Sequence, residues 1–196
     1  MMKKTGPFLC DEGRNGGSML KLEYDKKQIE DVIDRIVHKT MNMDLTWDWP
    51  CGVAYYGVSE AYEKTGKEEY LKLLKDRVDE LIDLGLPKVW TVNACAMGHC
   101  LITLYEATGE QRYWDILMSK VDYIRNDALR FGDHVLQHTV SANNDFPEQA
   151  RADTLFMAAF VLLRVGVTLK AEDMINHALN QWFGHSKHLQ NPGSRQ

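Results

Sequence analysis

Apolar residues recur along most of the chain at the spacing of an amphipathic helix. In the first such segment, residues 27–41, they fall three or four positions apart and give one apolar face. Residues 1–20 are instead rich in glycine and charge and show no apolar period. We therefore predict a flexible arm over 1–20 and a single helical domain over 21–196. The apolar residues of the first helix are Ile29, Val32, Ile33, Ile36, Val37 and Met41.

Two segments of the chain repeat each other at an offset of 43 residues. Residues 61–70 read AYEKTGKEEY and residues 104–113 read LYEATGEQRY. In each copy an apolar stretch precedes the Thr-Gly pair and an amphipathic stretch follows it. Glycine readily takes the left-handed conformation that ends a helix, so Gly66 and Gly109 are predicted to separate two helices each. Each copy is therefore a helical hairpin.

A third, weaker copy covers residues 150–189, with Gly166 as the predicted end of its first helix. The first helix of each hairpin is apolar nearly all round and the second is amphipathic, which is typical of inner and outer helices. Together with the opening helix this gives roughly seven helices. Stacked hairpins form either an open solenoid or a closed barrel. The long connections 84–92 and 129–149 exceed the usual ~2–8 residues between helices and favour a barrel.

The connections before the inner helices carry aromatic, polar and acidic side chains. Because these connections lie at the same end of three successive hairpins, we expect their side chains to converge on one mouth. The candidate residues are Trp47, Asp48, Trp49, Trp90, Asn93, His138, Asp145, Arg151 and Asp153.

Charge and cysteine usage narrow the class of protein. The formal net charge is −5 with both signs interspersed, so there is no basic stripe for nucleic acid, and we expect no membrane partner either. The first twenty residues lack the apolar core of a secretory signal. Four scattered cysteines suggest reduced thiols, and we expect a cytoplasmic protein.

Neither a metal nor a cofactor is predicted. Cys95 and His99 lie one helical turn apart, as do His185 and His188, but no further ligand follows either pair at a suitable spacing. The chain also has no nucleophile elbow, phosphate-binding loop or dinucleotide fingerprint.

Four stretches resemble glycoside hydrolase family 105, which is related to family 88 and comprises unsaturated rhamnogalacturonyl and glucuronyl hydrolases. The resemblance covers about residues 25–193 and implies an all-α fold of αα-hairpin repeats, part of an (α/α)6 barrel of the six-hairpin glycosidase type. The stretches are TWDWPCGVAYYG, WTVNACAMGHCLITLYEATGEQRY, FGDHVLQHTVSANNDFPEQARADTLFMAAFVLLRVG and NQWFGHSKHLQNP.

The resemblance also implies a reaction. These enzymes remove a 4,5-unsaturated uronic acid from the non-reducing end of lyase-generated oligosaccharides. An acid protonates C4 of the C4=C5 double bond and water adds at C5. The resulting hemiketal then opens, and the rest of the oligosaccharide is released. The substrate expected for this chain is therefore an unsaturated oligosaccharide.

Residue by residue, Asp153 matches the family's catalytic acid. Asn93 stands where many members have a second Asp, Trp49 matches an aromatic that stacks on the sugar, and His138 lies in a loop that contacts substrate. Arg151 departs from the Trp of many members, and two roles are open: pairing with the uronate carboxylate or neutralising Asp153. From the residue pattern alone, Asp153 could equally be a helix-capping or first-turn acid.

Members of the family have about twelve helices, so the chain matches the N-terminal half only. We expect an incomplete barrel: either the chain is a truncated form with weak or no activity of its own, which we favour, or two copies associate to cover the open edge. The competing class is a non-enzymatic αα-repeat module that binds another protein. Such a module needs no convergent cluster of Trp, Asn, His and Asp, whereas the enzyme does.

Overall fold

The computed structural model describes residues 25–190, and the predicted arm over 1–20 lies outside them. Seven main helical rods account for most of the described chain, the sixth of them built from three consecutive segments. The rods are α1 (Lys26–Met41), α2 (Trp49–Thr65), α3 (Glu68–Leu84), α4 (Gly98–Thr108), α5 (Gln111–Asp122), the run α6 (Ala152–Thr154), η3 (Leu155–Phe160) and α7 (Val161–Leu169), and α8 (Glu172–Leu189). The shorter elements are the 3₁₀ segment η1 (Asn93–Met97), the π-helical segment η2 (Tyr123–Asp127) and the strands β1 (Arg130–Phe131) and β2 (Val135–Leu136).

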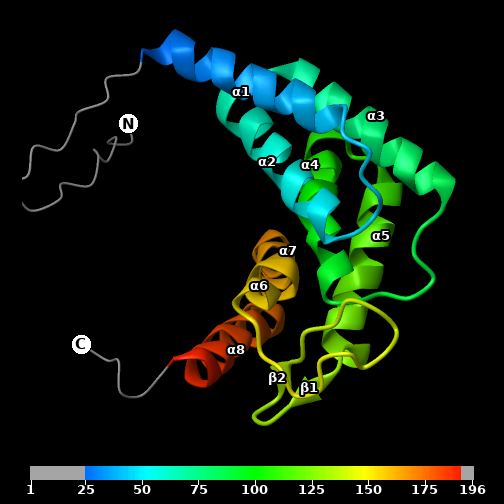
Figure 1. Cartoon of the computed structure of the whole chain (residues 1–196), viewed down its shortest axis with the longest axis vertical. Helices are drawn as coiled ribbons and strands as arrows, with labels where there is room; N and C mark the ends of the chain where they lie inside the picture. Colours follow the sequence, from blue (N-terminus) through cyan, green and yellow to red (C-terminus); the bar gives the residue numbers. More distant parts are fainter. Residues whose placement is uncertain (1–24, 191–196) are drawn as a thin grey trace, which may run out of the picture.

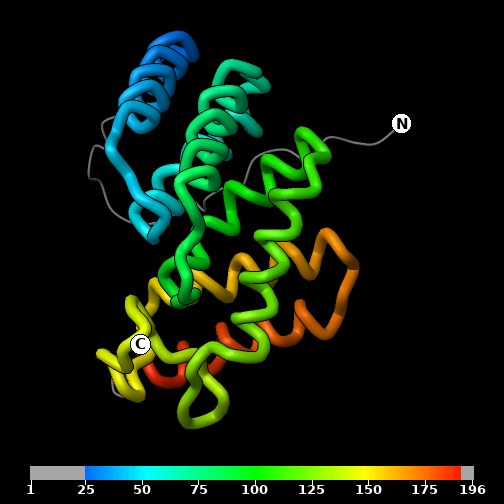
Figure 2. The backbone as a smooth tube through the Cα atoms, turned by 90° about the vertical axis from the view of Figure 1, so that its right-hand side faces the viewer, coloured from blue at the N-terminus to red at the C-terminus, as the bar shows by residue number. Residues whose placement is uncertain are grey.

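The helices form an arc of alternating inner and outer members. In Figure 1, α1, α3, α5 and α8 lie on the outside of the arc, and α2, α4 and the α6–η3–α7 run lie on its inside. The tube in Figure 2 shows the same succession of hairpins from the side, from α1 to α8. The predicted hairpin architecture with inner and outer helices is therefore confirmed.

The two Thr-Gly turns have the predicted geometry. Gly66 and Gly109 have φ values of 67° and 70°, in the left-handed region that favours glycine. Their backbone N–H groups donate to the carbonyl oxygens of Tyr62 and Tyr105, which ends the helix as a C-cap. The chain then reverses directly into the outer helix.

The tyrosine four residues after each glycine joins its hairpin to the preceding outer helix. Tyr70 and Tyr113 are fully buried. The hydroxyl of Tyr70 donates to Asp34 on α1, and that of Tyr113 donates to Asp79 on α3. The repeat in the sequence thus encodes both a turn and a bond between neighbouring hairpins.

The predicted role of Gly166 is wrong. Gly166 lies inside α7, which continues to Leu169 and ends with Lys170 in the left-handed conformation at φ 55°. A Cβ at Gly166 would lie only 3.0 Å from the Cβ of Met174 on α8. This glycine therefore permits the close approach of α7 and α8 instead of ending a helix.

The long connection over 129–149 is partly extended. Residues Arg130–Phe131 pair antiparallel with Val135–Leu136 in a small hairpin. The side chain of Gln181 on α8 accepts a hydrogen bond from the N–H of Leu136 and donates to the carbonyl of His134. This hairpin is thereby attached to the last outer helix.

One helical run is long and apolar enough to cross a membrane by length and composition alone. It covers Ala152–Leu169, and 44% of its residues are buried inside the structure. It packs against α8 and α4 as the third inner helix. Core helices of globular proteins pass the same test, so this is weak evidence for a membrane span.

We predict that the two tyrosine anchors differ in strength. Each carboxylate also pairs with a lysine, Asp34 with Lys67 and Asp79 with Lys75, but Asp79 is less exposed than Asp34. Removing the hydroxyl of Tyr113 leaves a partly buried carboxylate short of a donor, so Tyr113→Phe should lower the free energy of unfolding by about 1–3 kcal/mol. Tyr70→Phe should lower it by less than about 1 kcal/mol, since water can replace the lost bond. Urea unfolding followed by circular dichroism checks this, and a larger loss for Tyr70→Phe would contradict it.

Candidate active site

Asp153 lies in the first turn of the third inner helix, with its side chain 48% exposed. The residue before this helix, Arg151, has extended backbone, and the N–H of Thr154 donates to its carbonyl. Among the described residues, no backbone N–H donates to the Asp153 carboxylate. Asp153 is therefore not used as a hydrogen-bonding cap, and its carboxyl stays available to a ligand.

His138 is the buried neighbour of Asp153. Its Nδ1 lies 3.7 Å from Oδ1 of Asp153 and 3.3 Å from Oγ1 of Thr154, and its backbone N–H donates to the carbonyl of Gln149. Burial lowers the pKa of His138, and the nearby carboxylate of Asp153 only partly opposes this. A neutral imidazole therefore faces the carboxyl at neutral pH and can form a hydrogen bond with it.

Arg151 does not pair with Asp153. Its guanidinium lies over the ring of Phe146, 4.5 Å from the ring centroid, and its side chain is exposed. Phe146 in turn packs edge-on against His138, with ring centroids 5.4 Å apart. Of the two roles left open by the sequence, neutralisation of Asp153 is not seen, and the guanidinium is free for an anion.

Asn93 is joined to the His138 segment through the backbone. It is 4% exposed and begins η1, where its N–H donates to the carbonyl of Thr139 at 3.2 Å. The N–H of Val92 donates to Oγ1 of the same threonine at 2.9 Å. The side-chain Oδ1 of Asn93 is buried and has no hydrogen-bond partner in the described chain. An unpaired buried acceptor next to the site is suited to a ligand donor.

Trp49 and Trp47 have different environments although they are two residues apart. Trp49 begins α2, with its N–H bonded to the capping side chain of Asp48, and is 44% exposed. Trp47 is buried in the core. Trp49 is therefore the accessible ring of the two, and none of the described contacts joins it to Asp153 directly.

The five predicted residues thus form one connected group and one separate member. His138 contacts Asp153, Arg151 approaches His138 through Phe146, and Asn93 is bonded to the residue after His138. The η1 segment that begins at Asn93 packs against both α2 and η3, the segment that follows the Asp153 turn. Trp49, at the start of α2, joins the group only through that packing.

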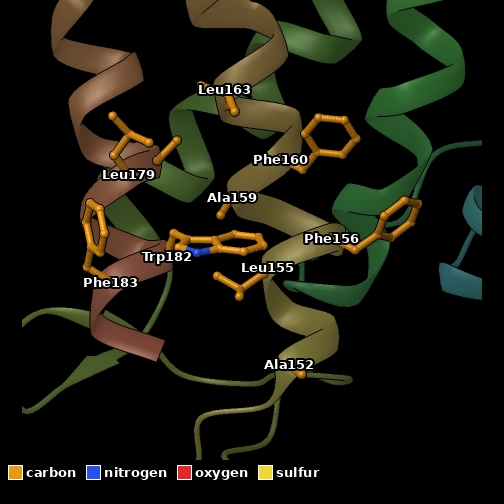
Figure 3. A pocket seen from close by; sticks show the side chains of 10 residues that line it. Ala152, Leu155, Phe156, Ala159, Phe160, Leu163, Leu179, Trp182 and Phe183 are labelled. Atoms are coloured by element: carbon orange, nitrogen blue, oxygen red, sulfur yellow. The ribbon is translucent and has the colours of Figure 1, made fainter. Parts of the chain in front are cut away.

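An apolar cavity of about 740 Å³ lies between η3, α7 and α8, beginning at Ala152 beside Asp153. Figure 3 shows the ring of Trp182 between α8 and the side chains of Leu155 and Ala159. Trp182 and Phe183 are 58% and 68% exposed. The lining residues are Ala152, Leu155, Phe156, Ala159, Phe160, Leu163, Ala178, Leu179, Trp182 and Phe183.

Two buried titratable residues near the site were not predicted. Lys120 is fully buried under Trp90, and His99 is fully buried beside η3. The sequence contains one indication that Lys120 is buried. It lies between Leu117 and Ile124 on the apolar face of an amphipathic helix. No comparable signal marks His99, which lies on a helix that is apolar on all sides.

The described residues contain one group that could hold a metal ion. Asp34, His38 and Glu69 offer ligand atoms within 4.8 Å of one another on α1 and α3. Their side chains are substantially exposed, and these two outer helices carry none of the predicted site residues. The group does not bear on the chemistry around Asp153.

Comparison with known proteins places the chain among glycosidases. The pattern of Glycosyl Hydrolase Family 88 matches residues 23–194. The chain is 46% identical over 175 residues to the unsaturated rhamnogalacturonyl hydrolase YesR of Bacillus subtilis (strain 168), covering 89% of this chain and 51% of that protein. It therefore spans about half the length of the curated relative it matches.

Two crystal structures show the same fold. Possible members of the GH105 family from Salmonella enterica serovar Paratyphi A and Klebsiella pneumoniae superpose with TM-scores of 0.79 and 0.76 at 21% and 20% identity. Each match covers 92% of this chain and 52% or 51% of the other. The arc of seven helical rods therefore corresponds to half of an (α/α)6 barrel.

We predict that His99 makes the fold less stable in acid. Its Nε2 lies 2.9 Å from the carbonyl oxygen of Phe156, and burial, with the charge of Arg164, lowers its pKa to about 4. An unfolded chain binds a proton at this histidine near pH 6.5, so stability present above pH 6.5 is lost as the pH falls towards 4.

Replacing His99 with glutamine should reduce the fall in the free energy of unfolding between pH 7 and 4.5 by about 1 kcal/mol or more. Urea unfolding of both proteins at several pH values measures it. His177→Gln is the matched control. His177 is a half-buried histidine on the outer helix α8 whose pKa is also lowered, so this variant shows how much of the change comes from losing any such histidine. An equal pH dependence in wild type and His99→Gln would show that His99 does not carry the effect.

Proposed function

The chain belongs to glycosyl hydrolase family 88, and from that premise we propose that it carries the acid catalyst of an unsaturated rhamnogalacturonyl or glucuronyl hydrolase. The proposed substrate is an oligosaccharide with a 4,5-unsaturated uronic acid at its non-reducing end. The observation that supports this most directly is the Asp153–His138 pair, an accessible carboxyl beside a buried imidazole at the mouth of three inner helices.

In the proposed reaction Asp153 gives its proton to C4 of the double bond, and positive charge develops at C5. A water molecule attacks C5 and returns a proton to the Asp153 carboxylate. The hemiketal at C5 then opens to a ketone, and the hemiacetal left at C1 releases the remaining oligosaccharide. Protons and electrons balance with water as the only co-reactant, so the step needs no metal ligand or cofactor from the chain.

The other site residues are proposed to bind and orient the sugar. His138 is neutral at neutral pH and can hold the Asp153 carboxyl in position by a hydrogen bond. The free Oδ1 of Asn93 can accept from a sugar hydroxyl, and the exposed ring of Trp49 can stack on the sugar face. The Arg151 guanidinium, stacked on Phe146, is placed to pair with the uronate carboxylate.

We also propose a cytoplasmic location. Cys51, Cys95 and Cys100 are buried and form no disulfide in the described part of the chain, which agrees with a reducing compartment.

Self-association is proposed to cover the open faces of the arc. The α7–α8 face exposes Trp182 and Phe183, and the opposite edge exposes Ile36 on α1 and Val53 on α2. Exposed apolar surface of this kind is typical of an interface. The described chain has three inner helices where an (α/α)6 barrel has six, so a second copy would supply the missing number.

The hydrolase proposal predicts that the ultraviolet absorbance of the C4=C5 double bond falls when the protein is added to lyase-generated oligosaccharides. Asp153→Asn removes the transferable proton and should lower the rate by about 10²–10⁴-fold with unchanged helical content. Asp133→Asn is the matched control, since Asp133 is an exposed carboxylate paired with Lys187 away from the site.

Because the chain spans about half of its curated relative, the same assay is run on a chimaera that joins it to the remaining part of the Bacillus subtilis protein. Turnover by either protein that survives Asp153→Asn would place the acid elsewhere. No turnover by either would remove the enzymatic proposal and favour a protein-binding repeat module.

The self-association proposal predicts a dimer or larger species at micromolar concentration, measured by light scattering after gel filtration. Replacing Trp182 and Phe183 with serine should shift the protein to the monomer mass. Leu84→Ser is the matched control, because Leu84 is 78% exposed at the end of α3, outside both open faces. A monomeric wild-type protein would contradict the proposal.

A further inference from the structure

Lys120 is a fully buried cation on the outer helix α5. Its Nζ donates to the carbonyl oxygen of Ala94 at 3.0 Å. The same Nζ lies 3.7 Å from the centroid of the Trp90 ring and 5.2 Å from that of Trp47. The ammonium is therefore held by one carbonyl and two indole rings.

The described residues provide no carboxylate to pair with this ammonium. The titratable groups that face it are the thiols of Cys95 on η1 and Cys100 on α4. Burial raises the pKa of both thiols, that of Cys95 to about 11, so both are neutral at physiological pH. Burial also lowers the pKa of Lys120 to about 8. Burying an unpaired charge destabilises the folded state because the charge loses its hydration. A hydrophobic residue of similar size at this position would make the fold more stable.

The contacts of Lys120 connect two loops of the candidate site. Ala94 directly follows Asn93, and Trp47 lies two residues before Trp49. These loops precede two successive inner helices that pack closely at Gly52 and Ala96, but among the described contacts none of the Trp49 ring or the Asn93 side chain links these two residues directly. The Lys120 ammonium touches both loops at one point.

We propose that Lys120 is a positioning residue that sets Trp49 and Asn93 relative to each other for sugar binding. It acts through the Ala94 carbonyl and the two indole rings and does not itself touch the substrate. The cation strengthens both kinds of contact, since a hydrogen bond from an ammonium is stronger than one from a neutral amine, and indole faces attract cations. This inference rests on the proposed sugar-binding function of Trp49 and Asn93.

The first test needs no substrate. Nuclear magnetic resonance distinguishes the five indole N–H groups and the Asn93 amide, and Lys120→Met removes the charge at similar length. We expect the resonances of Trp47, Trp90, Trp49 and Asn93 to shift, whereas that of Trp182 on α8 stays in place. Val121→Ala is the matched control, a buried change on the same helix that lies beside Met174 of α8 and should lower stability.

A pH titration of the wild-type protein keeps the test valid if Lys120→Met does not fold. The Trp90 and Asn93 resonances should move together with a midpoint near the pKa of Lys120, about 8. Unmoved Trp49 and Asn93 resonances, in the variant or across the titration, would overturn the inference irrespective of activity.

The second test measures binding of a lyase-generated unsaturated disaccharide in the Asp153→Asn background, where turnover is blocked. Adding Lys120→Met should weaken binding about tenfold, and adding Val121→Ala should not. Raising the pH from 7 to 9.5 should weaken binding in the parent but not in the Lys120→Met protein. Shifted resonances with no disaccharide binding by the parent would contradict the proposed function alone, and equal binding by parent and Lys120→Met would overturn the role of Lys120.

Discussion

Each inner helix of this fold has to be covered on both flanks, and the rest of the structure follows from that constraint. The helices α2 and α4 meet the requirement through their neighbours, and every residue of α4 from Gly98 to Leu104 is buried. The tyrosines that follow the Thr-Gly turns hold the successive hairpins in register for this packing. The third inner helix is covered by α4 and α8 but leaves the apolar face with Trp182 and Phe183 open.

The candidate site lies where the constraint is relaxed, in the loops that lead into the inner helices. These loops are held by polar contacts as well as by packing against the core. Thr139 bonds the backbone of Val92 and Asn93 to the segment after His138, and Lys120 joins Ala94 to Trp47 and Trp90. Loops held at a few defined points on a rigid scaffold can present side chains accurately.

Features with a local cause were predictable from the sequence. The φ values of Gly66 and Gly109 follow from a turn that only glycine adopts readily, and the inner and outer helices follow from their apolar periods. The role of Gly166 could not be predicted locally. A glycine that allows close packing of a neighbouring helix has the same local sequence as a glycine that ends a helix. Lys120 was missed because a long side chain on an outer helix can extend to solvent or into the core, and only the tertiary structure decides.

Four of the five site residues that came from the family resemblance lie near one another, but the sequence did not predict the environment of their side chains. Asp153 and His138 are adjacent, yet the direction of the Arg151 side chain, towards Phe146, depends on a loop that no local pattern defines. The orphan Oδ1 of Asn93 likewise results from the backbone bonds to Thr139, far away in sequence. The orientation of polar side chains in these loops is determined by contacts between residues far apart in the sequence.

The open face and the chemistry of the site are connected through the third inner helix. A carboxyl that acts as an acid at neutral pH is usually kept protonated by burial in an apolar surrounding. Here the Asp153 side chain is 48% exposed, and the apolar cavity beside it begins at the preceding residue, Ala152. A polypeptide that covers the α7–α8 face would therefore reach the residue next to Asp153. The open apolar face and the carboxyl proposed as the acid thus lie on the same inner helix, one residue apart.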